Sequence, residues 1–155
     1  MANVLIGSYT ARLDASGRIK IPEKFRETIE QVYGKDLFVT SLSDDSIKIY
    51  PLSVWLAMTD LTAEGAMHLR PDVRKFMLRV NRHGSRHELD PKGRVLISQA
   101  LRDKAKLKEE VEVLGLSNHL EIWNKDVLDG TLEEKPLSDE DFESIARLIP
   151  RGKPE

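Results

Sequence analysis

The decapeptide LDASGRIKIP occupies residues 13–22, and a close copy of it, LDPKGRVLIS, occupies residues 89–98. With the two segments aligned the offset is 76 residues, and six of the 14 positions 13–26 are identical to their counterparts. A second similarity follows in the same order, between LFVTSLSDDSIKIYP at 37–51 and VEVLGLSNHLEIWN at 111–124. Because chance rarely produces two such matches in the same order, we interpret the chain as an internal duplication of units of about 45 residues.

The pattern of each copy predicts a strand, a turn, a second strand, a helix and two further strands. The turn has four residues, DASG in the first copy and DPKG in the second. Asp14 and Asp90 stand at the first turn position, where a carboxylate accepts hydrogen bonds from the turn amides. Gly17 and Gly93 stand at the last position, where glycine tolerates the exit geometry. The turn therefore explains these four residues on structural grounds alone.

The residues after each turn predict a strand and then a helix. Ile19 and Ile21 alternate with polar residues, which is typical of a half-buried strand. Pro22 and Ser98 both suit the start of a helix, one in its first turn and the other as its cap. Gly34 ends the first helix. Two short strands follow in each copy.

Residues 52–82 connect the copies and predict two helices. Ser53 can cap the first of them, and Pro71 opens the second. After the second copy, Ser138 can cap an acidic helix with apolar residues on one face. We expect this tail to lie away from the turns and to pack its apolar face on the helices of residues 52–82, either in the same chain or in a neighbouring copy. The apolar residues are Phe142, Ile145, Leu148 and Ile149.

The charge of the chain is unevenly distributed. The formal net charge is −2, but residues 126–155 contain 9 acidic and 4 basic side chains. Residues 70–94 contain eight basic and three acidic side chains. This local excess of five positive charges is typical of a phosphate-binding patch. The alternative is a solvated helix face, the commoner meaning of a run of charges.

Several classes of function find no support in the sequence. The chain has no cysteine, which excludes disulfides and thiolate metal sites. His83 and His87 are four residues apart, but Gly84 lies between them and arginines flank them, so we expect no metal site. The common phosphate-loop, nucleophile-elbow and zinc-protease motifs are absent, so we expect neither an enzyme nor a cofactor. The N-terminal residues lack a secretion signal, and no apolar stretch reaches membrane-spanning length.

Arg18 and Arg94 follow the two turns at matching positions, although the turn itself does not require arginine there. A planar guanidinium on a protruding hairpin suits the O6 and N7 acceptors of guanine, a contact worth about 1–3 kcal/mol of discrimination. The alternative is an ion pair with the aspartate four residues earlier, and such pairs are common and weak. Both interpretations hold if the aspartate orients the arginine.

Other basic residues are candidates for phosphate contacts, which position a protein on DNA without reading its sequence. For each of them a solvated surface role is the alternative. The candidates are Arg12, Lys20, Lys24, Arg82, Arg86, Lys92 and Arg102.

The pattern LDxxGRIxIPxxxR resembles the AbrB-type swapped-hairpin DNA-binding domain. Two such copies, separated by a helical segment that includes RKFMLRVNRHGSRHELD and followed by a helical tail, resemble the MraZ family of transcriptional regulators. The resemblance covers nearly the whole chain. Ser16 departs from the family's usual lysine, which weakens phosphate contacts in the first copy, and Ser98 departs from its usual proline.

The resemblance implies a β-rich α+β fold, in which two swapped-hairpin repeats form a pseudo-twofold double-split β-barrel with helices packed in the linker and the tail. We expect the first repeat at residues 8–54, a helical linker at 55–83, the second repeat at 84–127 and the acidic tail at 128–155.

The resemblance also implies a cytoplasmic, nucleoid-associated regulator of its own operon and of the division and cell-wall gene cluster, acting as a repressor. The implied partners are double-stranded DNA with G-rich direct repeats and further copies of the chain, assembled into a ring, with no membrane and no small-molecule substrate. The alternatives are another AbrB-type regulator, such as an antitoxin or a developmental transition regulator, and an interaction scaffold. AbrB-type regulators of that kind usually carry one copy per chain, and the basic stretch 70–94 counts against a scaffold.

Overall fold

The computed structural model of the chain describes residues 4–60 and 69–149. The chain folds as two compact units, the first ending at Lys125 and the second starting at Asp126. The strands of the first unit are β1 (Leu5–Arg12), β2 (Arg18–Lys20), β3 (Asp36–Thr40), β4 (Ile47–Pro51), β5 (Ser85–Glu88), β6 (Arg94–Leu96), β7 (Glu110–Ser117) and β8 (Leu120–Trp123). Its helices are α1 (Glu23–Val32), α2 (Leu52–Met58), α3 (Pro71–Arg82) and α4 (Gln99–Lys104).

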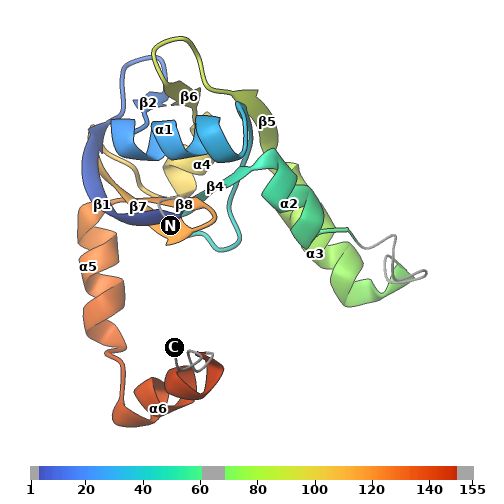
Figure 1. The fold of residues 1–155 in the computed structure, drawn as a ribbon, viewed down its shortest axis with the longest axis vertical. Coiled ribbons are helices and arrows are strands. Elements are labelled where there is room, and N and C mark those ends of the chain that lie inside the picture. The colour runs from blue at the N-terminus through green and yellow to red at the C-terminus, as the bar shows by residue number, and fades with distance from the viewer. Residues whose placement is uncertain (1–3, 61–68, 150–155) are drawn as a thin grey trace, which may run out of the picture. The chain divides into compact units, whose positions relative to one another are not determined.

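The two copies exchange strands. Six strands form an antiparallel sheet in the order β1-β7-β8-β4-β3-β5, and β2 pairs with β6 in a separate two-stranded ribbon. The first strand of each copy thus pairs with the third strand of the other copy, as β1 does with β7 and β5 does with β3. This order reads the same from both ends when the copies are interchanged. The predicted fold class, α+β and β-rich with two swapped repeats, is confirmed (Figure 1).

The same twofold relation governs the hydrogen bonds between the copies. The amide of Ile21 donates to the carbonyl of Gly93 at 2.9 Å, and the amide of Ile97 donates to the carbonyl of Gly17 at 2.8 Å. A single hydrophobic cluster draws buried residues from both copies, Ile19 and the strands β3, β4, β7 and β8 among them. Neither copy therefore encloses a core by itself, as expected for units this small.

A charged pair lies where the copies meet in the middle of the sheet. In the aligned repeats Lys48 of β4 corresponds to Glu121 of β8, and the strand register places these two residues opposite each other. The Lys48 amine lies 2.7 Å from a carboxylate oxygen of Glu121, and each side chain is 13% exposed. The Trp123 indole N–H also donates to Glu121 at 2.8 Å. The pseudo-twofold axis therefore passes between two residues of opposite charge.

The helices that follow the turns begin as predicted. Pro22 precedes α1, and Phe25 and Ile29 are buried on its inner face. The Ser98 hydroxyl caps α4 by accepting a hydrogen bond from the amide of Leu101 at 3.3 Å. The spacing of the apolar residues in the sequence predicts Val32 on the same helical face as Phe25 and Ile29, but Val32 is 42% exposed.

The helices between the copies match the predictions from the sequence only in part. Pro71 opens α3 as predicted, but Ser53 does not cap α2, because Pro51 precedes the helix and the cap carries no side-chain hydrogen bond. Trp55 of α2 and Val80 of α3 form a second buried cluster with residues of β3 and β4. Both helices extend away from the sheet (Figure 1). The apolar pattern that predicts the first of these helices continues to Leu61, which lies outside the described residues.

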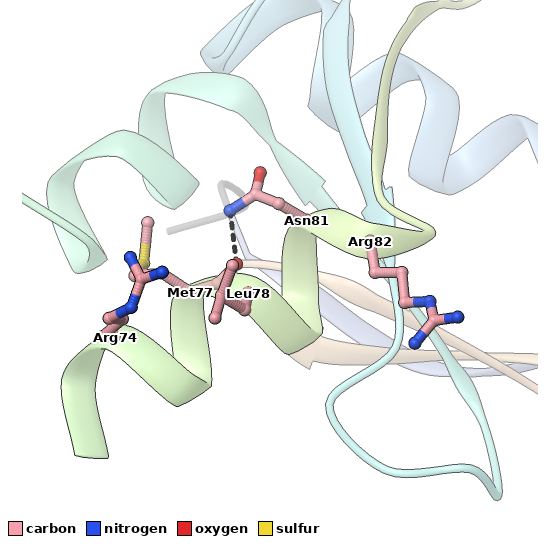
Figure 2. Close-up of a pocket in the computed structure, with 5 residues that line it drawn as sticks. All are labelled: Arg74, Met77, Leu78, Asn81 and Arg82. Atoms are coloured by element: carbon pink, nitrogen blue, oxygen red, sulfur yellow. Dashed lines mark hydrogen bonds between the residues drawn. The ribbon is translucent and has the colours of Figure 1, made fainter. Parts of the chain in front are cut away.

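An open groove with a volume of about 870 Å³ runs along α3. It is lined by apolar and basic side chains together (Figure 2): Arg74, Met77, Leu78, Asn81 and Arg82. Several large apolar side chains on α2 and α3 are exposed, among them Met58 at 52%, Phe76 at 41% and Leu78 at 57%. These helices consequently offer apolar surface that no other described element covers.

The second unit carries α5 (Lys125–Glu134) apart from its first residue, and all of α6 (Asp139–Leu148). Ser138 caps α6 as predicted: its hydroxyl accepts from the amide of Asp141 at 3.1 Å, and the Asp141 carboxylate accepts from the amide of Ser138 at 3.0 Å. The apolar face of α6 is exposed, with Phe142 at 57% and Leu148 at 81%. That this face packs on residues 52–82 stays a prediction. No described helix is long and apolar enough to cross a membrane.

Candidate nucleic-acid interface

The two predicted turns have the same hydrogen-bond pattern. One oxygen of the Asp14 carboxylate accepts the amides of Ser16 at 2.9 Å and Arg18 at 3.0 Å, and also the Ser16 hydroxyl at 2.6 Å. One oxygen of Asp90 accepts the amides of Lys92 at 2.9 Å and Arg94 at 2.8 Å. Each carboxylate thus closes its own turn and keeps its second oxygen available for another partner.

These hydrogen bonds also keep both carboxylates charged. The Ser16 hydroxyl, followed by the amide of Arg18, lowers the pKa of Asp14 below its ordinary value. The amide of Arg94 is the largest cause that lowers the pKa of Asp90. Both aspartates are therefore anionic at neutral pH and can orient a guanidinium.

Each turn is also braced by an arginine of the other copy. Gly17 and Gly93 have φ values of +85° and +77°, in the left-handed region that favours glycine. A Cβ on Gly93 would lie 2.8 Å from Cδ of Arg26, and one on Gly17 would lie 3.0 Å from Cζ of Arg102. The Arg26 guanidinium also donates to the carbonyl of Pro91 at 3.1 Å. The turn glycines therefore serve both the backbone conformation and this close approach.

Sequence reasoning missed the bracing role of Arg26 and gave Arg102 only a phosphate contact. In the structure Arg102 donates to the carbonyl of Ile97 at 3.1 Å and to the side chain of Gln99 at 3.2 Å. The sequence did contain a signal for a shared structural role, because Arg26 and Arg102 are one of the six identical pairs of the repeat. The phosphate contact of Arg102 stays a prediction.

The β2–β6 ribbon presents the twin arginines on its outer face. The register pairs Arg18 with Leu96, Ile19 with Val95, and Lys20 with Arg94. Because side chains alternate along a strand, the middle pair points to one face and the other two pairs to the opposite face. Ile19 and Val95 are buried at 0% and 1% exposure. The outer face therefore consists of Arg18, Lys20, Arg94 and Leu96.

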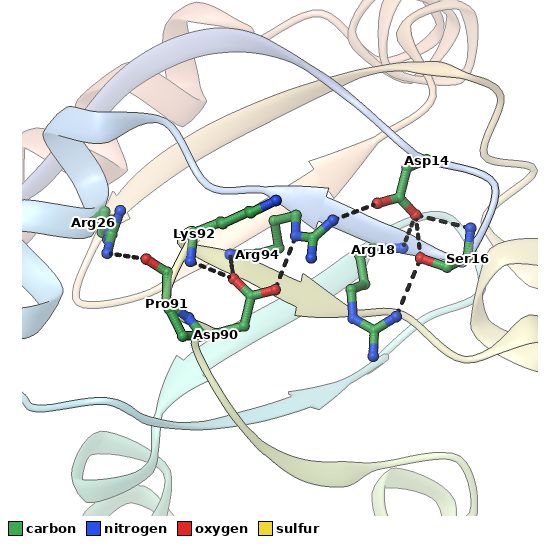
Figure 3. Close-up of polar contacts among 8 residues, drawn as sticks. All are labelled: Asp14, Ser16, Arg18, Arg26, Asp90, Pro91, Lys92 and Arg94. Atoms are coloured by element: carbon green, nitrogen blue, oxygen red, sulfur yellow. Dashed lines mark hydrogen bonds and ion pairs between the residues drawn. The ribbon is translucent and has the colours of Figure 1, made fainter.

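The two arginines differ in their partners, as Figure 3 shows. Nε of Arg94 lies 2.9 Å from Asp90, and Nη1 lies 3.4 Å from Asp14 of the other copy. Nη1 of Arg18 donates to the Ser16 hydroxyl at 3.2 Å. Among the described residues Arg18 forms no ion pair with a carboxylate, whereas Arg94 is held by one carboxylate from each copy. The predicted pairing of arginine with the turn aspartate thus occurs in the second copy.

The charge of Arg18 also acts on a nearby histidine. Burial lowers the pKa of His87, and the positive charge of Arg18 lowers it further. The ring of His87 shares a hydrogen bond with the Ser85 hydroxyl at 2.7 Å. His87 is therefore neutral at pH 7 and takes part in a local contact. The described residues contain no group of three or more side chains suited to hold a metal ion.

The remaining predicted cations lie around the ribbon on different elements. Lys92 lies in the second turn, Lys24 on α1, and Arg82 at the end of α3. Arg12 and Arg86 lie on the edge strands β1 and β5. These two form exposed ion pairs, Arg12 with Glu109 at 3.0 Å and Arg86 with Asp36 at 3.3 Å. Of the predicted phosphate contacts, Lys20 thus lies on the outer face of the ribbon with the twin arginines, and Lys92 lies in the turn that leads into β6 (Figure 3).

A protein-family model described as "MraZ protein, putative antitoxin-like" matches residues 4–69 and 81–147. The chain belongs to the MraZ family. The two matched segments of the MraZ model contain the two copies, β1–β4 in the first and β5–β8 in the second. The family resemblance of the duplicated motif is thereby confirmed.

Curated MraZ proteins resemble the chain over most of its length. The "Transcriptional regulator MraZ" of Acidobacterium capsulatum is 34% identical over 142 residues, which cover 92% of this chain and 97% of the relative. Proteins of the same name from Finegoldia magna and Koribacter versatilis are each 32% identical, covering 90% and 92% of this chain and 94% and 97% of the relatives. The similarity thus includes both repeats and most of the tail.

Proposed function

We propose that the chain is a sequence-specific, double-stranded-DNA-binding transcriptional regulator that represses its own operon and the division and cell-wall gene cluster. The observation that carries this proposal is the cationic outer face of the β2–β6 ribbon, with Arg94 held by two carboxylates. The names of the relatives, all transcriptional regulators, support it. The regulator acts in the cytoplasm on the nucleoid and needs no catalysis or cofactor.

A two-stranded ribbon has the right size to enter the major groove of DNA. Arg94 uses Nε and one N–H of Nη1 for its carboxylates, and Nη2 makes no hydrogen bond with the described residues, so a forked contact to guanine is still available. The two carboxylates fix the guanidinium plane before DNA arrives, which lowers the entropy cost of binding. Arg18 reads a second guanine from the other end of the ribbon.

The surrounding cations contact phosphates in this proposal. Arg12 and Arg86 are paired with carboxylates, but these pairs are exposed, with arginine side chains at 78% and 64%. Exposed ion pairs are worth at most about 1 kcal/mol, so a phosphate can replace the carboxylate. Lys20, Lys24, Arg82, Lys92 and Arg102 complete the proposed set.

We also propose that the chain acts as a homo-oligomer, arranged as a ring, on DNA with G-rich direct repeats. The exposed apolar side chains of α2 and α3 and the groove along α3 support a contact between copies (Figure 2). One chain offers a single ribbon, and a single ribbon discriminates weakly. Linking several in one assembly raises the effective concentration when the DNA repeats match their spacing.

The test compares operator and random DNA in fluorescence anisotropy, with the DNA upstream of the chain's own gene as operator. Arg18→Ala and Arg94→Ala should each reduce the preference for operator, and the double variant should abolish it. Arg70→Ala is the matched control, because it removes the same charge from an exposed residue at the start of α3. Unchanged preference in a double variant whose melting curve is normal would overturn the assignment.

Assembly is tested by light scattering and by shortening the operator. Binding should fall steeply when the repeats in the operator are reduced from several to one. Leu78→Asp, which places a charge on the exposed surface of α3, should reduce the size of the assembly. A wild-type chain that is monomeric at its working concentration would contradict the ring.

A further inference from the structure

The outer face of the ribbon departs from the twofold relation at one position. The repeat offset of 76 pairs Arg18 with Arg94, but it pairs Lys20 with Leu96. The strand register then places Lys20 beside Arg94, and Leu96 beside Arg18. One end of the face therefore has two cations, whereas the other end has a cation and an apolar side chain.

Leu96 does not belong to the hydrophobic core formed by the described residues. Its neighbours Val95 and Ile97 are buried at 1% and 0% exposure, and both belong to the main hydrophobic cluster. Leu96 is only partly buried and belongs to neither buried cluster of the described residues. Because side chains alternate along β6, it shares the outer face with Arg94. A leucine on this cationic surface does not serve the core.

The chemistry of the major groove suggests what such a side chain contacts. The groove edges of the bases are hydrogen-bond donors and acceptors, with one apolar exception, the 5-methyl group of thymine. Phosphates give no favourable contact to an apolar side chain. Side chains opposite each other on paired strands have Cβ atoms about 5 Å apart, so a base contacted by Leu96 lies within one or two base pairs of the base contacted by Arg18.

We propose that Leu96 contacts the methyl group of a thymine next to the guanine bound by Arg18, whereas the matching position at the other end of the face is Lys20, a phosphate contact. This inference rests on the proposed function, because it assumes that the ribbon enters the major groove. Its consequence is that the two halves of the ribbon read different base pairs. The bound site then has a direction along the DNA, although the protein fold is close to twofold symmetric.

The experiment starts from a library of random duplexes, from which the wild-type chain selects its preferred sequences. In a selected duplex each thymine is replaced in turn by deoxyuridine, which lacks only the methyl group. At one position near a selected guanine, the wild-type chain should bind the deoxyuridine duplex about fourfold more weakly than the thymine duplex. This is the factor expected for the loss of one buried methyl group. Leu96→Ala should bind both duplexes equally, and Leu96→Met, which keeps an apolar side chain, should still prefer thymine.

Two controls separate this contact from a change in folding or charge. Leu116→Ala removes an exposed leucine from β7, outside the ribbon, and should keep the wild-type preference. Leu96→Lys makes the two ends of the ribbon alike, so the sequences that this variant selects should no longer contain the preferred thymine. The deoxyuridine measurement on the wild-type chain decides the matter even where a Leu96 variant is unstable.

The outcomes distinguish the inference from the function on which it rests. If no duplex is enriched over random DNA, the proposed function fails. If duplexes are enriched and Arg94→Ala removes the enrichment, but deoxyuridine binds as well as thymine at every position, the role of Leu96 alone is wrong. A thymine preference that survives in Leu96→Ala would overturn it as well.

Discussion

Replacing Glu121 with glutamine tests the ion pair that joins the two copies in the middle of the sheet. Burial would raise the pKa of Glu121, but hydrogen bonds from His119, Lys48 and Trp123 outweigh it and hold the pKa at about 2, against an ordinary value of 4.5. The difference of about 2.5 pKa units corresponds to about 3 kcal/mol of folding free energy, because each unit is worth about 1.4 kcal/mol. The side chain is 13% exposed, so solvent screens little of this contribution.

The contribution should depend on pH in a defined direction. Because the pKa in the folded state lies below its unfolded value, the stabilisation is fully present above about pH 4.5 and is lost as the pH falls towards 2. Urea unfolding at one protein concentration should therefore separate wild type from Glu121→Gln by about 3 kcal/mol at pH 7 and by only about 1 kcal/mol at pH 3.

A double variant controls for the charge that Glu121→Gln leaves behind. Removing the carboxylate alone leaves the amine of Lys48 largely buried and unpaired, which is itself destabilising. Replacing Lys48 with methionine in the Glu121→Gln background removes that charge and should restore part of the loss. Equal differences between wild type and Glu121→Gln at pH 7 and pH 3 would refute the reasoning, because the loss would then not come from the ionised carboxylate.

Three further perturbations test other parts of the fold. A Cβ at Gly84 would overlap the Val80 carbonyl and the Phe38 ring, so Gly84→Ala should lower the free energy of urea unfolding by about 1–3 kcal/mol, and an unchanged midpoint would contradict this close approach. Ser98→Ala removes the cap of α4 and should cost about 1 kcal/mol in the same assay, whereas no loss would mean that the cap contributes nothing. Truncation after Asn124 should lower the melting temperature or shrink the oligomer in light scattering, while the salt dependence of DNA binding stays nearly unchanged. Much tighter DNA binding with assembly intact would instead identify the acidic tail as an autoinhibitory phosphate mimic.

Local chemistry made much of the fold predictable. Asp14 and Gly17 define their turn by side-chain hydrogen bonding and by a positive φ, both of which act within four residues. Ser98 and Ser138 cap helices for the same local reason. The exchange of strands between copies is not a local property. It followed from the family resemblance of the repeated motif, and the strand order confirms it.

The sequence predicted less where distant residues compete for a position. Ser53 is a good cap residue, but Pro51 ends β4 in an extended conformation and α2 starts directly after it. The unequal environments of Arg18 and Arg94 arise because the Asp14 carboxylate reaches across to the other copy. No spacing within one repeat encodes that contact. Which bases or phosphates the predicted cations bind stays a prediction.

The charge pair on the pseudo-twofold axis has a consequence for the ways in which copies can combine. In a dimer of identical single-copy chains, the residue on the axis faces itself, so a charged residue there always meets its own sign. Fusion of two copies into one chain removes this restriction and allows lysine on one side and glutamate on the other. Pairing of two first copies would bring two Lys48 side chains together, and pairing of two second copies would bring two Glu121 side chains together. Exchange of repeats between chains is consequently restricted to head-to-tail order, which can close into a circle or extend as a polymer but cannot end in a head-to-head dimer.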